Sequence, residues 1–350
     1  MKRKVLLTLT ALLLVPLAKL YAADAPERWA AEKANEWYAV QPWIVGCNFL
    51  PSTAVNDVEM WRAETFDAAT IRRELGWAHD LGFNTVRVFL NYVVWEADTS
   101  GLKNRFDQFL TIADKQGIRV MPILFDDCFK PEPRVGKQDE PVPGVHNSQW
   151  VRSPGVRRAA DQTGWPMLEK YVKDMVGTFG QDRRVVIWDL YNEPATTSLP
   201  LVEATFRWAR ETNPDQPLAS CWIAEPFSDL INLHHYGMLD GLKKVVAGAM
   251  KSGRPIIVSE WMARTTGSRF ETHLPFFKEN KIACWNWGLV AGRTQTHFPW
   301  NSQQNAPEPE VWHHDILRKD GTPFNEREVA TIRYITGMRK TPPPVPQTEK

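Results

Sequence analysis

Val185-Val186-Ile187-Trp188-Asp189-Leu190-Tyr191 is the stretch that decides the fold class, because it is an almost unbroken apolar run rich in strand-forming residues. A strand of this kind is buried on both faces, as parallel strands covered by helices are. The amphipathic segments 167–179 and 201–211 lie before and after it, and both are predicted to be helices. This part of the chain therefore alternates helix and strand, which is the pattern of an α/β protein with a parallel sheet.

The same alternation runs through most of the chain. Further strands are predicted at 43–49, 85–90, 118–125, 218–223, 230–236, 256–259 and 282–288, and further helices at 67–82, 106–117, 239–252 and 270–280. Three hundred and fifty residues would permit one domain or two. Eight strand–helix units in one domain favour a closed (β/α)8 TIM barrel over an open doubly wound sheet.

Two connections are much longer than an ordinary barrel loop. The first follows the third strand, from Asp126 to Trp165, and the second follows the eighth strand, from Leu289 to about Phe324. Both lead from a strand to a helix, so both are expected on the face of the barrel that carries active sites.

The two ends of the chain have compositions of their own. Lys2, Arg3 and Lys4 precede an apolar run that ends before Ala22-Ala23, which predicts a signal peptide at 1–23 and export to the periplasm or medium. An uncleaved anchor is the alternative, and no later stretch is apolar enough to insert stably in a membrane. The barrel domain is then expected at 24–340, followed by a flexible proline-rich tail at 341–350.

Composition excludes some partners and leaves the cysteines ambiguous. With 42 basic and 41 acidic residues, nothing supports a nucleic-acid partner. Cys47, Cys128, Cys221 and Cys284 form no CxxC pair, and three disulfide pairings are possible in an oxidising compartment. Buried free thiols are the favoured interpretation. The spacing supports no metal site.

Two glutamates are the main candidates for chemistry. Glu193 follows the fourth strand in Tyr191-Asn192-Glu193-Pro194, and Glu260 ends the seventh in Val258-Ser259-Glu260-Trp261. Barrel enzymes place their catalytic groups at these strand ends, and strands four and seven face each other across the barrel. Asn192-Glu193-Pro194 alone could also be a helix start, with Asn192 as the N-cap.

At these residues the sequence resembles clan A retaining glycoside hydrolases, and most closely the cellulase-like family 5. The two glutamate motifs carry the resemblance, together with Arg87 on strand two, His234-His235-Tyr236 on strand six, and Trp285 or Trp287 on strand eight. It extends over about 43–288. One departure is the third strand, which ends in Asp126-Asp127 where the family more often has a histidine, and this leaves the substrate open.

The resemblance implies roles for these residues. Glu193 would be the acid/base and Glu260 the nucleophile of a double displacement, with carboxyl groups roughly 5–5.5 Å apart. Burial and the charge of Glu260 should keep Glu193 protonated near neutral pH. Arg87 and Tyr236 are expected against Glu260, and Asn192 against the sugar 2-hydroxyl.

The other candidates have alternatives in packing. His234 could simply bond neighbouring backbone, and His235 should point away by strand alternation. Trp285 and Trp287 should face one side, one as core and the other beneath a sugar, whereas Asp126 and Asp127 would contact substrate or cap a turn. The loop tryptophans, Trp150, Trp300 and Trp312, are weaker candidates for sugar stacking.

These features predict an enzyme that cleaves β-glycosidic bonds in a glucan-, mannan- or xylan-type saccharide. A transglycosylase with the same glutamates and a non-catalytic carbohydrate-binding barrel are the alternatives. The sequence contains no GxSxG, HExxH, P-loop or dinucleotide motif, so no cofactor or metal is implied. Cleavage at chain ends is slightly favoured over internal cleavage, whereas the sugar and the oligomeric state stay open.

Overall fold

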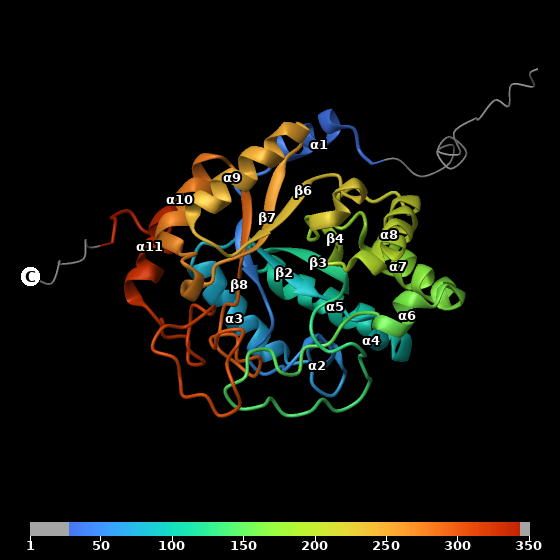
Figure 1. Cartoon of the computed structure of the whole chain (residues 1–350), viewed down its shortest axis with the longest axis horizontal. Coiled ribbons are helices and arrows are strands. Elements are labelled where there is room, and N and C mark those ends of the chain that lie inside the picture. Colours follow the sequence, from blue (N-terminus) through green and yellow to red (C-terminus); the bar gives the residue numbers. More distant parts are fainter. Residues whose placement is uncertain (1–27, 344–350) are drawn as a thin grey trace, which may run out of the picture.

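A barrel of parallel strands forms the centre of the computed structural model, which describes residues 28–343 (Figure 1). The strands are β1 (Val45–Asn48), β2 (Thr85–Phe89), β3 (Arg119–Asp126), β4 (Trp188–Asn192), β5 (Leu218–Ala219), β6 (Ile231–His235), β7 (Ile256–Trp261) and β8 (Ala283–Trp287). They form one 8-stranded sheet in the order β5-β4-β3-β2-β1-β8-β7-β6. The predicted (β/α)8 barrel is confirmed, whereas the predicted signal peptide and residues 344–350 of the predicted tail lie outside the described residues.

The barrel closes weakly between β5 and β6. The predicted strand 218–223 is wrong beyond Ala219, because the N–H of Ser220 donates to the Ser228 hydroxyl and a short 3-10 helix begins at Trp222. One parallel bridge, between Cys221 and Asn232, joins this segment to β6. The mouth of the barrel at this point is therefore bordered by a helical turn.

Helices surround the sheet and bury its outer face. They are α1 (Ala31–Ala39), α2 (Asp57–Trp61), α3 (Ala68–Asp80), α4 (Tyr92–Ala97), α5 (Thr99–Asp114), α6 (Val156–Ala160), α7 (Trp165–Phe179), α8 (Leu199–Glu211), α9 (Leu239–Ala249), α10 (Phe270–Glu279) and α11 (Glu326–Thr336). Asp67 caps α3 as its sequence suggests, since its carboxylate accepts the N–H of Thr70 at 3.0 Å. No helix within residues 28–343 combines the length and apolarity needed to span a bilayer.

The floor of the barrel is a separate apolar cluster. Trp285 is fully buried there, with Met121 and Ile257 from other strands. Trp29, just before α1, and Ala34, within α1, belong to the same cluster and close the amino-terminal end of the barrel. This packing leaves the opposite end, where the strands finish, as the open mouth.

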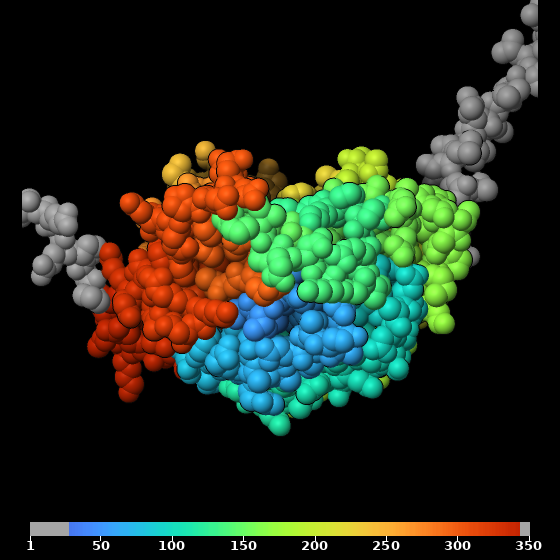
Figure 2. Space-filling view, turned by 90° about the horizontal axis from the view of Figure 1, so that it is seen from below, coloured from blue at the N-terminus to red at the C-terminus, as the bar shows by residue number. Residues whose placement is uncertain are grey.

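The two long loops meet beside that mouth. Figure 2 shows the loop after β3, in green, in contact with the loop after β8, in orange. Three histidine rings pack together between them, with ring centroids 5.8 Å apart for His146 and His313, 5.4 Å for His146 and His314, and 4.3 Å for His313 and His314. Burial lowers the pKa of His146 to about 4 and of His313 to about 3, and neighbouring charges, Arg264 among them, add to the effect on His313.

This cluster is expected to make the protein acid-sensitive. An unfolded histidine takes up its proton near pH 6.5, whereas folded His146 stays neutral down to about pH 4, so stability falls as the pH drops through this interval. For His146 the loss is about 2 kcal/mol between pH 7 and pH 5. Urea unfolding at both pH values should show a smaller loss in His146→Gln than in wild type, and the same loss as wild type in a variant of exposed His79, His79→Gln. Equal losses of stability in all three proteins would contradict the contribution of His146 to the acid sensitivity.

Candidate active site

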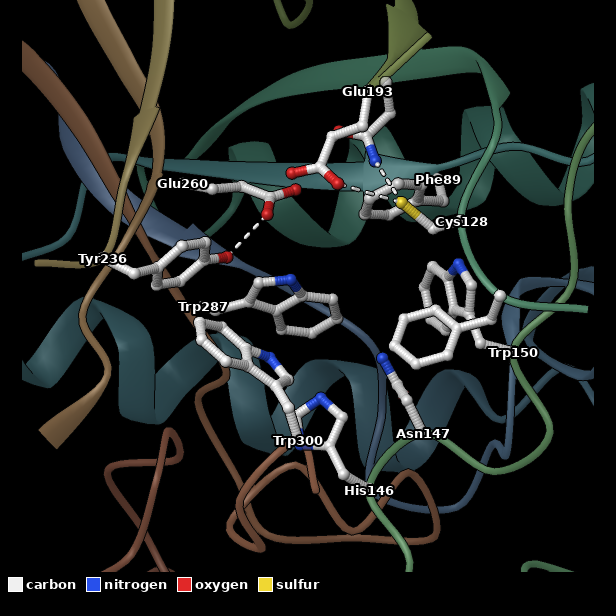
Figure 3. Close-up of a pocket in the computed structure, with 12 residues that line it drawn as sticks. Phe89, Cys128, His146, Asn147, Trp150, Glu193, Tyr236, Glu260, Trp287 and Trp300 are labelled. Atoms are coloured by element: carbon white, nitrogen blue, oxygen red, sulfur yellow. Dashed lines mark hydrogen bonds between the residues drawn. The ribbon is translucent and has the colours of Figure 1, made fainter. Parts of the chain in front are cut away.

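Two glutamates face each other at the mouth of the barrel. Glu193 directly follows β4 and Glu260 lies on β7. One oxygen of each carboxylate and one ring nitrogen of His234 all lie within 4.8 Å of one another. The structure therefore brings together the two carboxylates that the sequence singled out (Figure 3).

The backbone at Glu193 has an unusual conformation. Its φ is +43°, in the left-handed region that non-glycine residues rarely adopt, and such residues cluster at functional sites. The Glu193 N–H points to the Cys221 sulfur at 3.1 Å, and the Cys128 thiol contacts Glu193 Oε2 at 3.2 Å. The turn after β4 is thus fixed so that the carboxylate projects over the mouth.

Glu260 is held by a donor on each of its two oxygens. Arg87 Nη1 donates to Oε1 at 2.7 Å. The Tyr236 hydroxyl donates to Oε2 at 2.6 Å (Figure 3). Both contacts are the ones expected from the sequence. They fix the direction of the carboxylate and offset its charge in a buried place.

Arg87 organises the base of the site. Its side chain is fully buried and also forms an ion pair with Asp189 at 2.7 Å and hydrogen bonds to Asn48 and Asn192 at 2.7 Å each. Burial lowers the pKa of Arg87, but Asp189 and Glu260 outweigh this and raise it above its usual value. The guanidinium is a permanent cation between β2, β4 and β7.

A short hydrogen bond joins His234 and Glu193. His234 Nδ1 lies 2.7 Å from Glu193 Oε1 and 3.6 Å from Glu260 Oε2, and Nε2 lies 2.9 Å from the Ser259 hydroxyl. Burial lowers the pKa of His234, yet the charges of Glu260 and other neighbours raise it well above its ordinary value. Burial raises the pKa of Glu193, but the bond and charge of His234 more than compensate and lower it. The expectation that Glu193 alone keeps the proton is therefore wrong, because in the resting site the proton lies on the His234 side of the pair.

Among residues 28–343, one group of three side chains has the residue types and the spacing that could hold a metal ion. It consists of Glu193, His234 and Glu260. A zinc ion about 2.1 Å from each tetrahedral ligand separates ligand atoms by about 3.4 Å. The 2.7 Å between His234 and Glu193 is a hydrogen-bond distance instead. The donor set fits proton sharing better than metal binding.

Asp126 and Asp127 lie behind the site and act on its neighbours. Asp126 accepts from Asn192 Nδ2 and Trp150 Nε1, both at 2.8 Å, and burial raises its pKa to about 7. Asp127 accepts from the Tyr191 hydroxyl at 3.1 Å and from a backbone N–H at 2.9 Å. Neither lines the cavity, and Asp126 caps the turn after β3, since its Oδ1 accepts the Cys128 N–H at 3.1 Å.

An aromatic cavity of about 160 Å³ adjoins the two glutamates (Figure 3). Its lining residues are Phe89, Cys128, Phe129, His146, Asn147, Trp150, Asn192, Glu193, Tyr236, Glu260, Trp287 and Trp300.

Trp287 lies at the centre of this cavity, with Phe89 stacked at 6.3 Å. Trp285, the other candidate on β8, belongs to the barrel floor and does not reach the cavity, because two residues along a strand shift a side chain by one layer of the barrel.

Some of the remaining candidate residues line the cavity and others do not. Trp150 and Trp300 line the cavity, whereas Trp312 is buried against Phe324 with ring centroids 4.7 Å apart. His235 points outward beside Gly241 as strand alternation predicts. Asn192 lines the cavity, with its oxygen bound to Arg87 and one amide hydrogen bound to Asp126.

Sequence reasoning missed several residues of the site. All four cysteines are free, as favoured, but Cys128 is only partly buried and reaches Glu193. His146 and Asn147 lie in a loop without periodicity, and no local signal marks them. Asp189 had a signal, because a lone carboxylate inside an apolar strand needs a buried cation, here Arg87.

No family model and no curated protein matches the chain, but solved structures do. An exo-β-1,4-mannosidase from Opitutaceae bacterium strain TAV5 superposes with a TM-score of 0.57 at 16% identity over 84% of this chain and 58% of that chain. This chain thus spans less than two thirds of that protein.

Two further structures are similar over more of their own length. A glycoside hydrolase family 5 mannosidase from Rhizomucor miehei gives a TM-score of 0.55 at 14% identity over 85% of this chain and 93% of that chain. An endo-β-1,4-mannanase from Thermotoga petrophila gives a TM-score of 0.53 at 11% identity, over 84% of this chain and 76% of that chain. The chain therefore shares its (β/α)8 barrel fold with these mannosidases, one of which is of glycoside hydrolase family 5, and with this mannanase.

Proposed function

We propose that the chain is a retaining β-glycoside hydrolase with Glu260 as nucleophile and Glu193 as acid/base. The observation that carries this is that one oxygen of Glu193 and one oxygen of Glu260 lie within 4.8 Å of each other. Retaining enzymes hold their carboxyl groups about 5–5.5 Å apart, whereas inverting enzymes need about 6.5–9.5 Å to admit a water molecule. The separation supports direct attack by one carboxylate.

The surrounding residues support the two steps of a double displacement. In the first step Glu260 attacks the anomeric carbon while the proton shared by His234 and Glu193 passes through Glu193 Oε1 to the leaving oxygen. Esterification then removes the negative charge of Glu260, which is the largest single factor that raises the pKa of His234. In the second step Glu193, as a carboxylate, takes a proton from water, and the water attacks the glycosyl ester.

We infer a β-linked glucan, mannan or xylan saccharide as the substrate class and place β-mannosides first. Several proteins with a similar fold are named mannosidases or mannanases. Trp287 supplies a stacking surface for a sugar ring beside the carboxylates. The sequence at 1–23 further suggests action outside the cytoplasm.

A substrate panel tests the proposal. The full chain would be assayed on aryl β-mannoside, β-glucoside and β-xyloside and on the corresponding polysaccharides, with Glu260→Ala as the inactive reference. Turnover of at least one substrate that disappears in the variant is the expected result. Binding of these sugars without turnover would favour a carbohydrate-binding protein instead.

The pH profile should reveal the shared proton. Since the pKa of His234 is raised, kcat/KM of the wild type should stay high above pH 6.5 and fall only as His234 loses its proton. In His234→Asn the catalytic proton rests on Glu193 alone. The fall of kcat/KM on the alkaline side of the pH profile should therefore occur at lower pH than in the wild type. A limb at the same pH in both proteins would show that His234 does not hold the catalytic proton.

A further inference from the structure

Gln295, in the loop after β8, joins the two long loops through its side chain. Its Oε1 accepts the N–H of Gly144 at 2.8 Å, and its Nε2 donates to the carbonyl of Val142 at 2.8 Å and lies 3.4 Å from that of Val145. All three partners belong to the loop after β3. One glutamine thus binds the backbone of the other loop on both sides of Pro143.

Backbone bonds and close packing extend this junction. Asn147 N–H donates to the Thr294 carbonyl at 2.8 Å, and Asn305 N–H donates to the Pro143 carbonyl at 2.7 Å. A Cβ at Gly144 would lie 2.6 Å from Ala306 N, so the two chains touch there. The loops form one continuous wall, which we call the β3–β8 wall (residues 126–165 and 289–324).

The segment after β1 anchors the wall from below. Arg293 pairs with Glu140 at 2.9 Å and with Glu59 at 3.4 Å, and its N–H donates to the Ser52 carbonyl at 3.1 Å. Asn56 adds bonds of 2.9 Å to the Gln138 side chain and the Gln149 carbonyl. Loops from β8, β1 and β3 are therefore tied together on one side of the barrel mouth.

The other side of the mouth is open. Only a short 3-10 turn separates β4 from α8, and a 3-10 helix that begins at Trp222 follows β5. The Trp222 ring is 47% exposed and lies 5.6 Å from the His234 ring, on the side of Glu193. Figure 3 shows Trp300, His146 and Asn147 beyond Trp287 from Glu193, toward the wall.

The positions of the two glutamates decide which end of the substrate meets the wall. Glu193 delivers the proton to the leaving oxygen, so the leaving group extends over β4 and β5, where the mouth is open. The attacked sugar lies over Trp287, and any sugar attached to its non-reducing end would have to pass through the β3–β8 wall. The cavity that holds both glutamates and borders the wall measures about 160 Å³, below the roughly 300–1,000 Å³ of pockets that enclose larger ligands.

We propose, on the basis of the proposed function, that the β3–β8 wall makes the site blind and restricts cleavage to the terminal sugar at the non-reducing end. Gln295 binds residues 142–145 of the facing loop, so it helps to keep the wall closed and contributes to this specificity. It does not line the cavity, so its effect is on access and not on the chemical step.

The first test uses β-1,4-mannopentaose and cellopentaose labelled at the reducing end. Removal of terminal sugars produces the labelled tetrasaccharide first, then the trisaccharide, with free monosaccharide from the start. Early labelled disaccharide or trisaccharide without the tetrasaccharide would overturn the proposal. Turnover of aryl monoglycosides is measured in parallel. No turnover of the aryl glycosides, the pentasaccharides or the polysaccharides would refute the proposed function itself, whereas pentasaccharide turnover without the stepwise ladder would refute only the terminal mode of cleavage.

The second test opens the wall. Gln295→Ala should retain aryl monoglycoside turnover within about threefold and gain internal cleavage of the pentasaccharide, whereas Gln303→Ala, in the same loop but bonded only within it, should behave as wild type. If Gln295→Ala does not fold, Gln295→Glu keeps the acceptor for Gly144 and places a carboxylate against the two carbonyls. A folded variant with an unchanged product ladder would remove Gln295 from the account of specificity.

Discussion

Glu260→Ala is expected to lose turnover by a factor on the order of 10⁵–10⁶, as other enzymes do when their covalent nucleophile is removed. The reason is that, among the described residues, Glu193 and Glu260 are the carboxylates that line the cavity, and Glu193 is assigned to proton transfer. The loss should appear in kcat for every substrate, including aryl glycosides with good leaving groups. Steady-state assays of purified wild type and variant measure it directly.

Two comparisons distinguish a loss of catalysis from a loss of folding in Glu260→Ala: the folded state of the variant and the activity of a matched control variant. Arg87 keeps its ion pair with Asp189 at 2.7 Å in the variant, so the fold should survive. Glu279→Ala, which removes an exposed glutamate from α10, should match the wild type. A folded Glu260→Ala protein with more than about a hundredth of wild-type activity would exclude Glu260 as nucleophile.

Glu193→Ala is expected to show a loss that depends on the leaving group. General acid catalysis contributes about 10²–10⁴-fold, so natural saccharides, whose alcohols leave poorly, should be cleaved slower by that factor. Activated aryl glycosides need no proton for the first step, so their initial burst should remain and the glycosyl ester should accumulate. Stopped-flow release of the aryl alcohol measures this burst.

External azide should reveal the same role. It attacks the glycosyl ester without base assistance, so it should restore turnover of activated substrates in Glu193→Ala and yield a β-glycosyl azide. Glu203→Ala, an exposed position on α8, serves as the control. Equal losses for good and poor leaving groups, with no response to azide, would show that Glu193 is not the acid/base.

The sequence predicted the barrel well because its strands are local apolar runs and its helices have their own caps. Asp67 and Gly82 delimit α3 as expected, since a cap and a left-handed glycine (φ +79°) act within a few residues. The error at 218–223 arose from a tertiary contact, the bond between Ser220 and the Ser228 hydroxyl, which propensity does not register. Barrel closure beside Trp222 therefore could not be predicted.

Site residues at strand ends could be predicted from the sequence, whereas site residues in the long loops could not. Glu193, Glu260, Arg87 and Tyr236 lie at or near strand ends, and the barrel itself brings them together. Which of Trp285 and Trp287 is core stayed open, because alternation gives the face of a strand and not the depth in the barrel. The β3–β8 wall was hidden because it depends on contacts between segments about 150 residues apart, such as Gln295 and Gly144.

The protonation of the site also lay beyond sequence reasoning. Burial and repulsion from Glu260 were expected to keep the proton on Glu193, but His234 lies at 2.7 Å and competes for it. Only the geometry of β6 shows that the histidine points inward at Glu193. The acid in this account is therefore a pair of residues.

The most direct test of the central claim is the anomeric configuration of the first product. Hydrolysis of the best aryl β-glycoside would be followed by proton NMR in deuterated buffer, before the free sugar mutarotates. Double displacement through Glu260 predicts that the β-anomer appears first and the α-anomer follows slowly. An α-anomer at the earliest time points would mean inversion and would contradict the assignment of Glu260 as nucleophile.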